Sequence, residues 1–121
     1  MAEHNITGTK GEKIAADFLK NKGYVILETN WRFKNLEADI IAQYNNQLVV
    51  AEVKTRKSNY FGEPESFVDK RKQQNLVRAA NAYVLQHQLN LDVRFDIISI
   101  IIGNNKQQIN HIEDAFYAGV K

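Results

Sequence analysis

Apolar and polar residues alternate along two neighbouring segments, residues 37–44 and 47–56, which are separated by Asn45 and Asn46. Alternation with a period of two indicates β-strands. Two consecutive asparagines tolerate the positive φ angles of a two-residue hairpin turn. The pattern therefore predicts an antiparallel hairpin. Because both of its faces carry apolar residues, we expect it inside a sheet that is covered on both sides.

A helix is predicted for residues 10–22, because Ile14, Phe18 and Leu19 form an apolar side at helical spacing. Gly23 is the expected C-terminal stop, and Thr9-x-x-Glu12 has the spacing of a capping box. The other expected elements are a strand at 24–33, a loop at 58–64, a helix at 69–88 capped by Ser66 or Asp69, a strand at 94–102, a turn at Asn104-Asn105, an edge strand at 108–112 and a helical tail at 114–118.

The order of these elements predicts a single α/β domain over residues 1–121, in which the apolar strand at 94–102 is parallel and buried on both faces. The chain has 121 residues and no cysteine. That composition excludes a disulfide framework, a cysteine nucleophile and a thiolate zinc site. Residues 1–10 contain no apolar signal region, and no apolar run reaches membrane-spanning length. We therefore expect a cytoplasmic protein without a membrane partner.

An acid and a base stand almost side by side in the second hairpin strand, at Glu52 and Lys54, about 6.6 Å apart along one face. Asp39 lies as far before the turn as Glu52 lies after it, so the hairpin places these two carboxylates opposite each other. By the same count, Glu37 faces Lys54. Two facing carboxylates destabilise a sheet unless a positive charge lies between them, and a hard cation supplies one. The pattern thus predicts a divalent metal site suited to activating water on a phosphodiester.

A structural interpretation of the same four charges stays open, namely a charge ladder on a solvated sheet face. Ile41 and Val50 share that face, which argues against solvation. A bulge between Asp39 and Tyr44 would shift the register by one residue and remove the facing pair of carboxylates.

The net charge of +2 says little, but the distribution of charge is uneven. Residues 54–78 hold seven basic and three acidic side chains, a balance that suits a phosphate backbone and equally a solvated helix face. Lys70, Arg71 and Lys72 fall in the first turn of the second predicted helix, where the helix dipole disfavours cations. Their position suggests an anionic partner, although an exposed turn also tolerates cations.

Several short motifs occur in a characteristic order between Gly11 and Phe116. They are Gly11-Glu12-x-x-Ala15, Asn30-Trp31-Arg32, Leu36-Glu37-Ala38-Asp39, Glu52-Val53-Lys54-Thr55-Arg56, Phe61-Gly62 with Pro64, Lys72-Gln73 and Arg94-Phe95-Asp96-Ile97-Ile98. In the order αβββαβ, the chain resembles the PD-(D/E)xK nuclease superfamily. More narrowly it is similar to the YraN family of small bacterial proteins, which are related in fold to archaeal Holliday junction resolvases. Leu36 and Ala38 stand where that family usually has glycine and isoleucine.

The resemblance implies a three-layer, restriction-endonuclease-like core whose central mixed sheet is flanked by helices. It also implies a metal-dependent endonuclease acting on structured or branched DNA. Asp39 and Glu52, with the backbone carbonyl of Val53, would hold Mg²⁺ or Mn²⁺, and Lys54 would orient the attacking water or stabilise the transition state. Glu12 would complete the metal shell, if it is not simply part of the capping box.

Four residues are candidates for phosphate contacts: Arg32, Arg56, Lys72 and Gln73. Tyr60 and Phe61 are candidates for stacking on an unpaired base or for packing their own loop. Trp31 is expected in the core or at a helix–sheet contact, and the three histidines are interpreted as incidental. A nuclease that cuts two strands usually needs two sites, so a homodimer is a further expectation. Two alternatives stay open: a nucleic-acid-binding module of this fold without turnover, and a protein interaction domain with a structural charge ladder.

Overall fold

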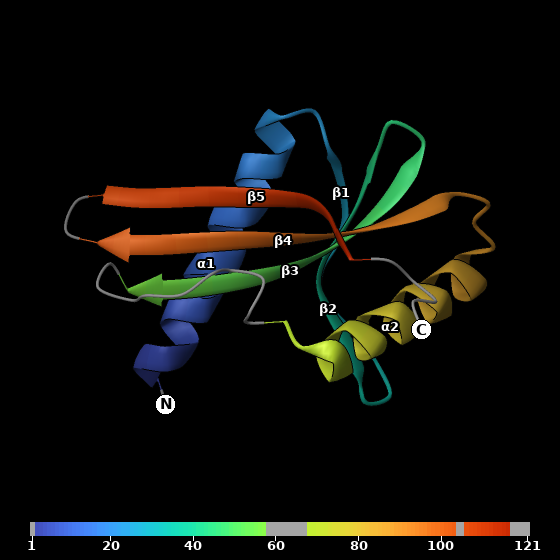
Figure 1. Cartoon of the computed structure of the whole chain (residues 1–121), viewed down its shortest axis with the longest axis horizontal. Helices are drawn as coiled ribbons and strands as arrows, with labels where there is room; N and C mark the ends of the chain where they lie inside the picture. The colour runs from blue at the N-terminus through green and yellow to red at the C-terminus, as the bar shows by residue number, and fades with distance from the viewer. Residues whose placement is uncertain (1, 58–67, 104–105, 117–121) are drawn as a thin grey trace.

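The computed structural model describes residues 2–57, 68–103 and 106–116. In chain order the elements are α1 (Ala2–Asn21), β1 (Val25–Phe33), β2 (Leu36–Tyr44), β3 (Gln47–Lys57), α2 (Lys70–His87), β4 (Asp92–Gly103) and β5 (Lys106–Phe116). The strands form one sheet in the order β1-β2-β3-β4-β5, in which only the β3–β4 pair is parallel. The prediction of an α/β domain with a mixed sheet flanked by helices is confirmed (Figure 1), and the arrangement is consistent with a restriction-endonuclease-like fold.

Two apolar clusters, one on each face of the sheet, hold the helices in place. The α1 cluster includes Leu19, Ile40, Val49, Ile98 and Ile100, and the α2 cluster includes Ile41, Val50, Leu76, Phe95 and Ile97. The central strands therefore bury successive side chains on opposite faces, as their near-continuous apolar sequence predicted. These two layers of apolar contacts fix the positions of both helices relative to the charged residues of β2 and β3, which are Asp39, Glu52 and Lys54.

The predicted hairpin turn and its register are confirmed. Asn45 and Asn46 have φ angles of 50° and 64°, as a tight turn of this kind requires. The pairing runs outward from Tyr44↔Gln47 to Ile40↔Ala51 without a bulge. Asp39 and Glu52 are the next residues on each strand.

Helix α1 begins much earlier than predicted, at Ala2 rather than Lys10. Thr9 is consequently an interior helical residue, and the predicted capping box is wrong. The end of the helix is as predicted: Gly23 has a φ of 96°, and the N–H of Tyr24 returns to the carbonyl of Leu19 at 3.0 Å.

Helix α2 begins one residue after its predicted cap. Asp69 has extended backbone angles, and its carboxylate accepts a hydrogen bond of 2.9 Å from the N–H of Lys72. The predicted loop at 58–64, the alternative cap Ser66 and the candidate stacking residues Tyr60 and Phe61 lie outside the described residues.

The parallel strand β4 is confirmed, but the chain after it differs from the prediction. Strand β5 continues to Phe116 along the edge of the sheet, so residues 114–116 are not helical as predicted. The reason lies in the neighbouring strand, because the N–H of Asp114 donates to the buried carboxylate of Asp96 and Phe116 stacks on Phe95 at 5.1 Å. The predicted turn at Asn104-Asn105 lies outside the described residues.

Trp31 provides the predicted contact between sheet and helix. Its ring meets the ring of Tyr83 on α2 edge-on, with centroids 5.4 Å apart. Over the part of the chain that the structure describes, no helix is both long and apolar enough to cross a membrane.

Candidate active site

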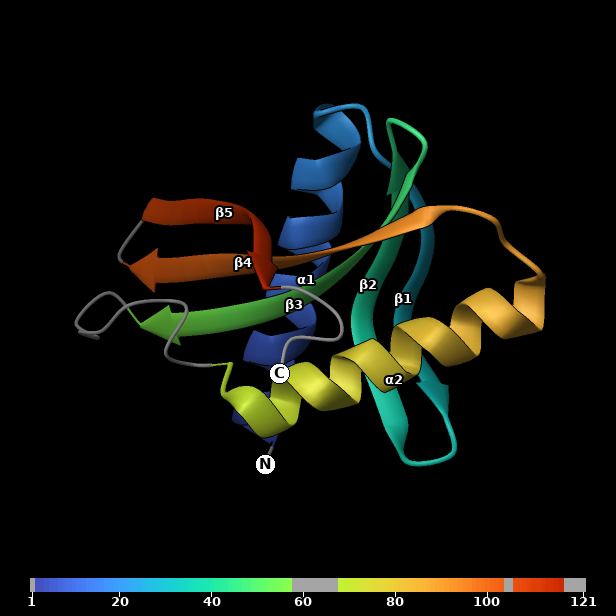
Figure 2. The same ribbon diagram turned by 45° about the vertical axis from the view of Figure 1, so that its right-hand side comes forward.

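The candidate site lies where the sheet divides. Strand β3 stays paired with β4 as far as Lys57↔Ile102, whereas its pairing with β2 ends at Ile40↔Ala51. Beyond that point β1 and β2 turn away from the other strands, as Figures 1 and 2 show. Asp39 is the first residue past the division, and its carboxylate accepts a 2.9 Å hydrogen bond from the N–H of Val53. A side chain thus takes the place of a backbone partner, which holds the carboxylate against β3.

The environment of Asp39 opposes its ionisation. Burial raises the pKa of Asp39 most, the neighbouring Glu52 carboxylate raises it further, and the result is a value of about 7. The hydrogen bond from Val53 and the charge of Lys72 oppose this shift without cancelling it. The predicted proximity of Asp39 and Glu52 therefore appears as a real electrostatic conflict between two carboxyl groups.

Glu52 is buried, with only 4% of its surface exposed, and two lysines offset its charge. Its Oε2 lies 3.4 Å from Nζ of Lys54 on the same strand and 3.3 Å from Nζ of Lys72 on α2. Burial disfavours the charged form of Lys72, but the Glu52 carboxylate outweighs this effect and raises the pKa of Lys72. Lys72 is thereby a residue of the site itself rather than of the outer surface.

The predicted pairing of Glu37 with Lys54 does not occur. Glu37 lies on β2, which has already left β3, and its carboxylate is 3.7 Å from Arg32 on β1. Lys54 instead contacts Glu52. The divergence of the strands, which alternation along the sequence does not indicate, is the reason for this difference.

Helix α1 lies on the face of the sheet opposite to α2, and Gly11 allows it to approach the site closely. A Cβ atom on Gly11 would overlap Oγ1 of Thr55, so only glycine allows this contact between helix and strand. The contact brings Glu12 beside the carboxylates. Burial raises the pKa of Glu12, and the negative charges of Asp39 and Glu37 raise it further. The structure thus places Asp39 within electrostatic reach of two other predicted site carboxylates, Glu12 and Glu52.

The chemistry of these donors suits Mg²⁺ or Mn²⁺, because such ions take oxygen ligands and carboxylates that repel each other gain from a shared cation. The suppressed ionisation of Asp39 beside Glu52 is the observation that supports this fit. Within residues 2–57, 68–103 and 106–116, no three histidine, aspartate or glutamate side chains gather as a ready-made metal site. Asp39 and Glu52 would therefore be the principal protein ligands, with Val53 following on the same strand.

The predicted phosphate contacts are dispersed around the site. Arg32 is exposed beside Glu37, and Arg56 donates to the carbonyl of Thr55 at 2.9 Å. The side-chain amide of Gln73 donates to the carbonyl of Val68 at 3.0 Å, which ties it to the chain before α2. Of these candidates, Lys72 contacts the candidate metal ligand Glu52.

A second cluster of charges, which the sequence analysis missed, is centred on Asp96. This residue is 0% exposed, yet its carboxylate accepts hydrogen bonds of 2.8 and 2.9 Å from Arg94 and of 2.7 Å from Nε2 of His111. The Nδ1 atom of His111 lies 2.9 Å from Nζ of Lys22. Because an ammonium group can only donate, Nδ1 accepts and Nε2 donates to Asp96.

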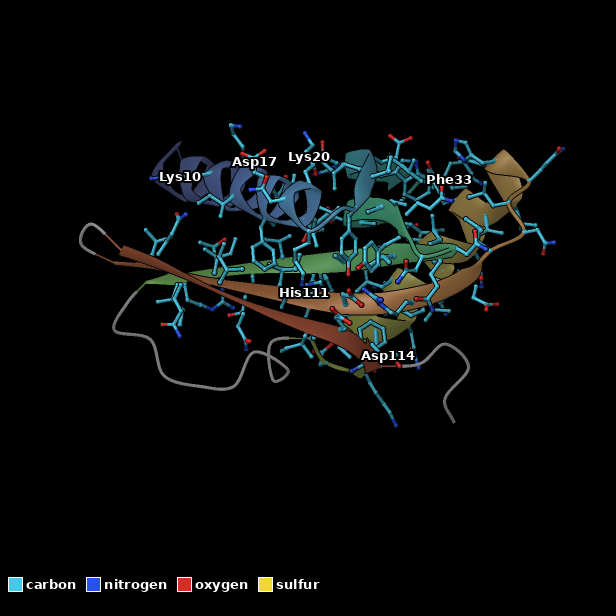
Figure 3. All side chains as sticks on the ribbon, turned by 90° about the horizontal axis from the view of Figure 1, so that it is seen from above. Lys10, Asp17, Lys20, Phe33, His111 and Asp114 are labelled. Atoms are coloured by element: carbon cyan, nitrogen blue, oxygen red, sulfur yellow. The ribbon has the colours of Figure 1, made fainter. Side chains whose placement is uncertain are left out.

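This cluster joins the end of α1 to β4 and β5, and His111 lies in the strand layer beneath α1 (Figure 3). Burial alone would raise the pKa of Asp96, but the hydrogen bonds from His111 and Arg94 lower it below the ordinary value. The interpretation of His111 as incidental is therefore wrong. The available signal was Arg94-x-Asp96 within an apolar strand, because buried charges require partners.

Comparison with known proteins places these features in a family. Residues 11–100 match the family described as uncharacterised protein family UPF0102, and Glu12, Asp39, Glu52 and Lys54 all fall within that range. UPF0102 protein FP2501 of Flavobacterium psychrophilum is 53% identical over 117 residues, which cover 97% of this chain and 98% of the relative. UPF0102 proteins of Christiangramia forsetii and Bacteroides thetaiotaomicron are 50% and 47% identical, with 97% of this chain covered and 98% and 97% of each relative.

Proposed function

Since the chain belongs to the uncharacterised protein family UPF0102, as its similarity to YraN-type proteins predicted, we propose that it is a metal-dependent endonuclease acting on structured or branched DNA. The observation that carries this proposal is the pair of the partly buried Asp39 and the buried Glu52, in which the pKa of Asp39 rises to about 7, with two lysine ammonium groups within 3.4 Å of Glu52. A carboxyl group with suppressed ionisation, close to partly buried charged side chains, is typical of catalytic sites.

In this proposal the carboxylates of Asp39 and Glu52, with the carbonyl of Val53, bind Mg²⁺ or Mn²⁺. Such an ion, when bound, polarises the phosphate and lowers the pKa of a water molecule. The N–H of Val53 holds Asp39 in place through its 2.9 Å hydrogen bond. Glu12 adds a third negative charge from α1, which strengthens the attraction for a divalent cation.

The two lysines complete the proposed chemistry. Lys54 and Lys72 lie within 3.4 Å of Glu52, one on β3 and one on α2. Once Glu52 binds a cation, both ammonium groups become available to phosphate oxygens. Lys54, on the same strand as Glu52, would orient the attacking water or stabilise the negative charge that develops on the phosphate.

The deciding experiment measures cleavage of a branched DNA substrate with Mg²⁺ or Mn²⁺ by the wild type, Asp39→Asn and Asp17→Asn. Asparagine preserves the shape of the side chain and can still accept the hydrogen bond from Val53. Asp17 is an exposed carboxylate on α1 paired with Lys13 at 3.2 Å, so its variant controls for the loss of one charge. We expect cleavage by the wild type and Asp17→Asn only. Equal cleavage by Asp39→Asn would refute the assignment of the site.

A second candidate function is nucleic-acid binding without turnover. It is favoured by one observation, that two lysines already offset the charge of Glu52. This function predicts salt-dependent DNA binding that does not change when Mn²⁺ is added. Calorimetric titration of the wild type with Mn²⁺ separates the two candidates, because only a nuclease of the proposed type binds the ion through Asp39.

A further inference from the structure

Helix α2 is unusual in the sign of its charges. It contains Lys70, Arg71, Lys72 and Arg78 but no acidic residue over its whole length, Lys70–His87. Its N-terminal turn carries three of these cations, where the helix dipole disfavours positive charge. Their mutual repulsion and unfavourable position would both be relieved by an anion. Among the residues that the structure describes, Lys72 is the one of these four with a carboxylate partner, Glu52, at 3.3 Å.

The outer face of α2 forms one wall of a polar groove of about 550 Å³, here called the α2 groove. The other wall is the turn between β1 and β2, which projects past the helix in Figure 2. Its lining residues are Asn35, Leu36, Arg71, Gln74, Asn75 and Arg78. The four from α2 are spaced as one helical stripe, so their side chains share a face. The groove therefore presents two guanidinium groups and three amide side chains, and no carboxylate from the described residues.

Neither arginine of the α2 groove has a carboxylate partner in the described part of the chain. Arg78 donates only to the side chain of Asn75, at 3.5 Å. The nearest acid along β2, Glu37, is within 3.7 Å of Arg32 instead. Arg71 and Arg78 are seven residues apart, about 10.5 Å along the helix axis, which is about three nucleotide rises along one strand. This spacing suits two phosphates that lie about three nucleotides apart on one strand.

Two residues that line the α2 groove are close along the chain to residues of the candidate active site. Leu36 in the groove is three residues before Asp39 on β2, and Arg71 precedes Lys72, whose ammonium contacts Glu52. We propose that the α2 groove binds the phosphodiester backbone of a nucleic-acid strand and directs that strand toward Asp39 and Glu52. Arg71 and Arg78 contact the phosphates, and the amide side chains donate further hydrogen bonds. The delivery of a strand to Asp39 and Glu52 rests on the proposed nuclease function. The binding of a strand in the α2 groove does not depend on that function.

Binding can be tested separately from cleavage in the Asp39→Asn background. The probe is a fluorescein-labelled DNA oligonucleotide, and the measurement is its dissociation constant by fluorescence anisotropy at several salt concentrations. The test variant adds Arg71→Ala and Arg78→Ala. The matched control adds Lys13→Ala and Lys20→Ala, which remove the same charge at the same seven-residue spacing from the exposed face of α1. Lys20 is labelled there in Figure 3.

Loss of two phosphate contacts should make the slope of log K against log salt shallower by about 1.4 on single-stranded DNA and about 1.8 on a duplex. We expect this change in the test variant, and the slope of the parent in the control. If the test variant loses the same affinity for DNA and for RNA of the same sequence, the ligand of the groove is the phosphate backbone. Equal slopes for test variant, control and parent, or no binding by any of them, would overturn the inference.

The two proposals fail in different ways. If the wild type cleaves DNA and Asp39→Asn does not, but the arginine variant binds like its parent, only the α2 groove is refuted. If the wild type cleaves nothing but the arginine variant still shows the shallower slope of log K against log salt, the proposal for the α2 groove stands. The protein is then a nucleic-acid-binding module without turnover.

Discussion

The carboxylate of Asp39 accepts a 2.9 Å hydrogen bond from the backbone N–H of Val53, one residue beyond the last backbone pair between β2 and β3. This bond joins the two arms of the divided sheet through a side chain. It also holds Asp39 next to Glu52, in a partly buried position where the Glu52 carboxylate raises the pKa of Asp39. One local contact therefore links the shape of the sheet to the electrostatics of the candidate site.

Asp39→Asn should change the dependence of stability on pH. The folded pKa of Asp39, about 7, lies above the ordinary value of 3.8, so between these values the folded state binds more protons than the unfolded state. The free energy of unfolding of the wild type should therefore fall as pH rises through this window. Asparagine does not titrate, so at pH 8 the variant should be more stable, on the order of a few kcal/mol. Urea unfolding between pH 4 and 8 checks this; parallel curves for the two proteins would contradict it.

Metal binding should show the opposite dependence on pH. Protons compete with a cation for Asp39, so affinity for Mn²⁺ should increase as pH rises from about 6 to about 8. A bound ion should also raise the melting temperature of the wild type, by an amount that grows with the logarithm of the Mn²⁺ concentration above Kd. Differential scanning fluorimetry with and without Mn²⁺ tests both statements. The same stabilisation in Asp39→Asn would show that the ion binds elsewhere.

Gly11→Ala should separate α1 from β3. The added methyl group overlaps Thr55, and overpacking of this kind costs about 1–3 kcal/mol. Thr55→Ala removes the overlapping atom, so the double variant should recover much of the lost stability in a double-mutant cycle. Gly23→Ala is the control, because its cost arises from a φ of 96° and Thr55→Ala should not relieve it. Additive losses for Gly11→Ala and Thr55→Ala would rule out the steric explanation.

Asp96→Ala should be among the most destabilising single substitutions in this chain. It leaves Arg94 and His111 without the carboxylate that both contact, and breaking a buried ion pair in this way costs about 3–5 kcal/mol. Chemical denaturation measures the loss, with the exposed Asp17→Ala as the control. A loss as small as that of the control would mean that the cluster contributes nothing.

The same residue should contribute to acid unfolding of the wild type. Hydrogen bonds from His111 and Arg94 lower the pKa of Asp96, so its stabilising contribution is complete above the ordinary pKa and is lost as pH falls below about 4. Acid titration followed by circular dichroism should show a transition in that range. Asp96→Asn, if it folds, should lack this part of the pH dependence.

The sequence by itself determined the elements that depend on local chemistry. The alternation around Asn45-Asn46 predicted the hairpin and its register, Gly23 predicted the end of α1, and Asp69 was one of two predicted caps for α2. Each depends on a backbone angle or a hydrogen bond within a few residues. The same turn predicted the proximity of Asp39 and Glu52, although the backbone pairing ends one residue before them, at Ile40↔Ala51.

Only the tertiary structure decided how these elements meet. The division of the sheet separated Glu37 from Lys54, packing of α2 brought Lys72 to Glu52, and the approach of α1 at Gly11 brought Glu12 to the site. The extension of β5 in place of a helical tail depended on Asp96 in a different strand. These outcomes follow from contacts between residues far apart in the chain. The free energies of these contacts come from burial and from charges in a shared low-dielectric environment. A pattern within a few residues of sequence does not predict either of them.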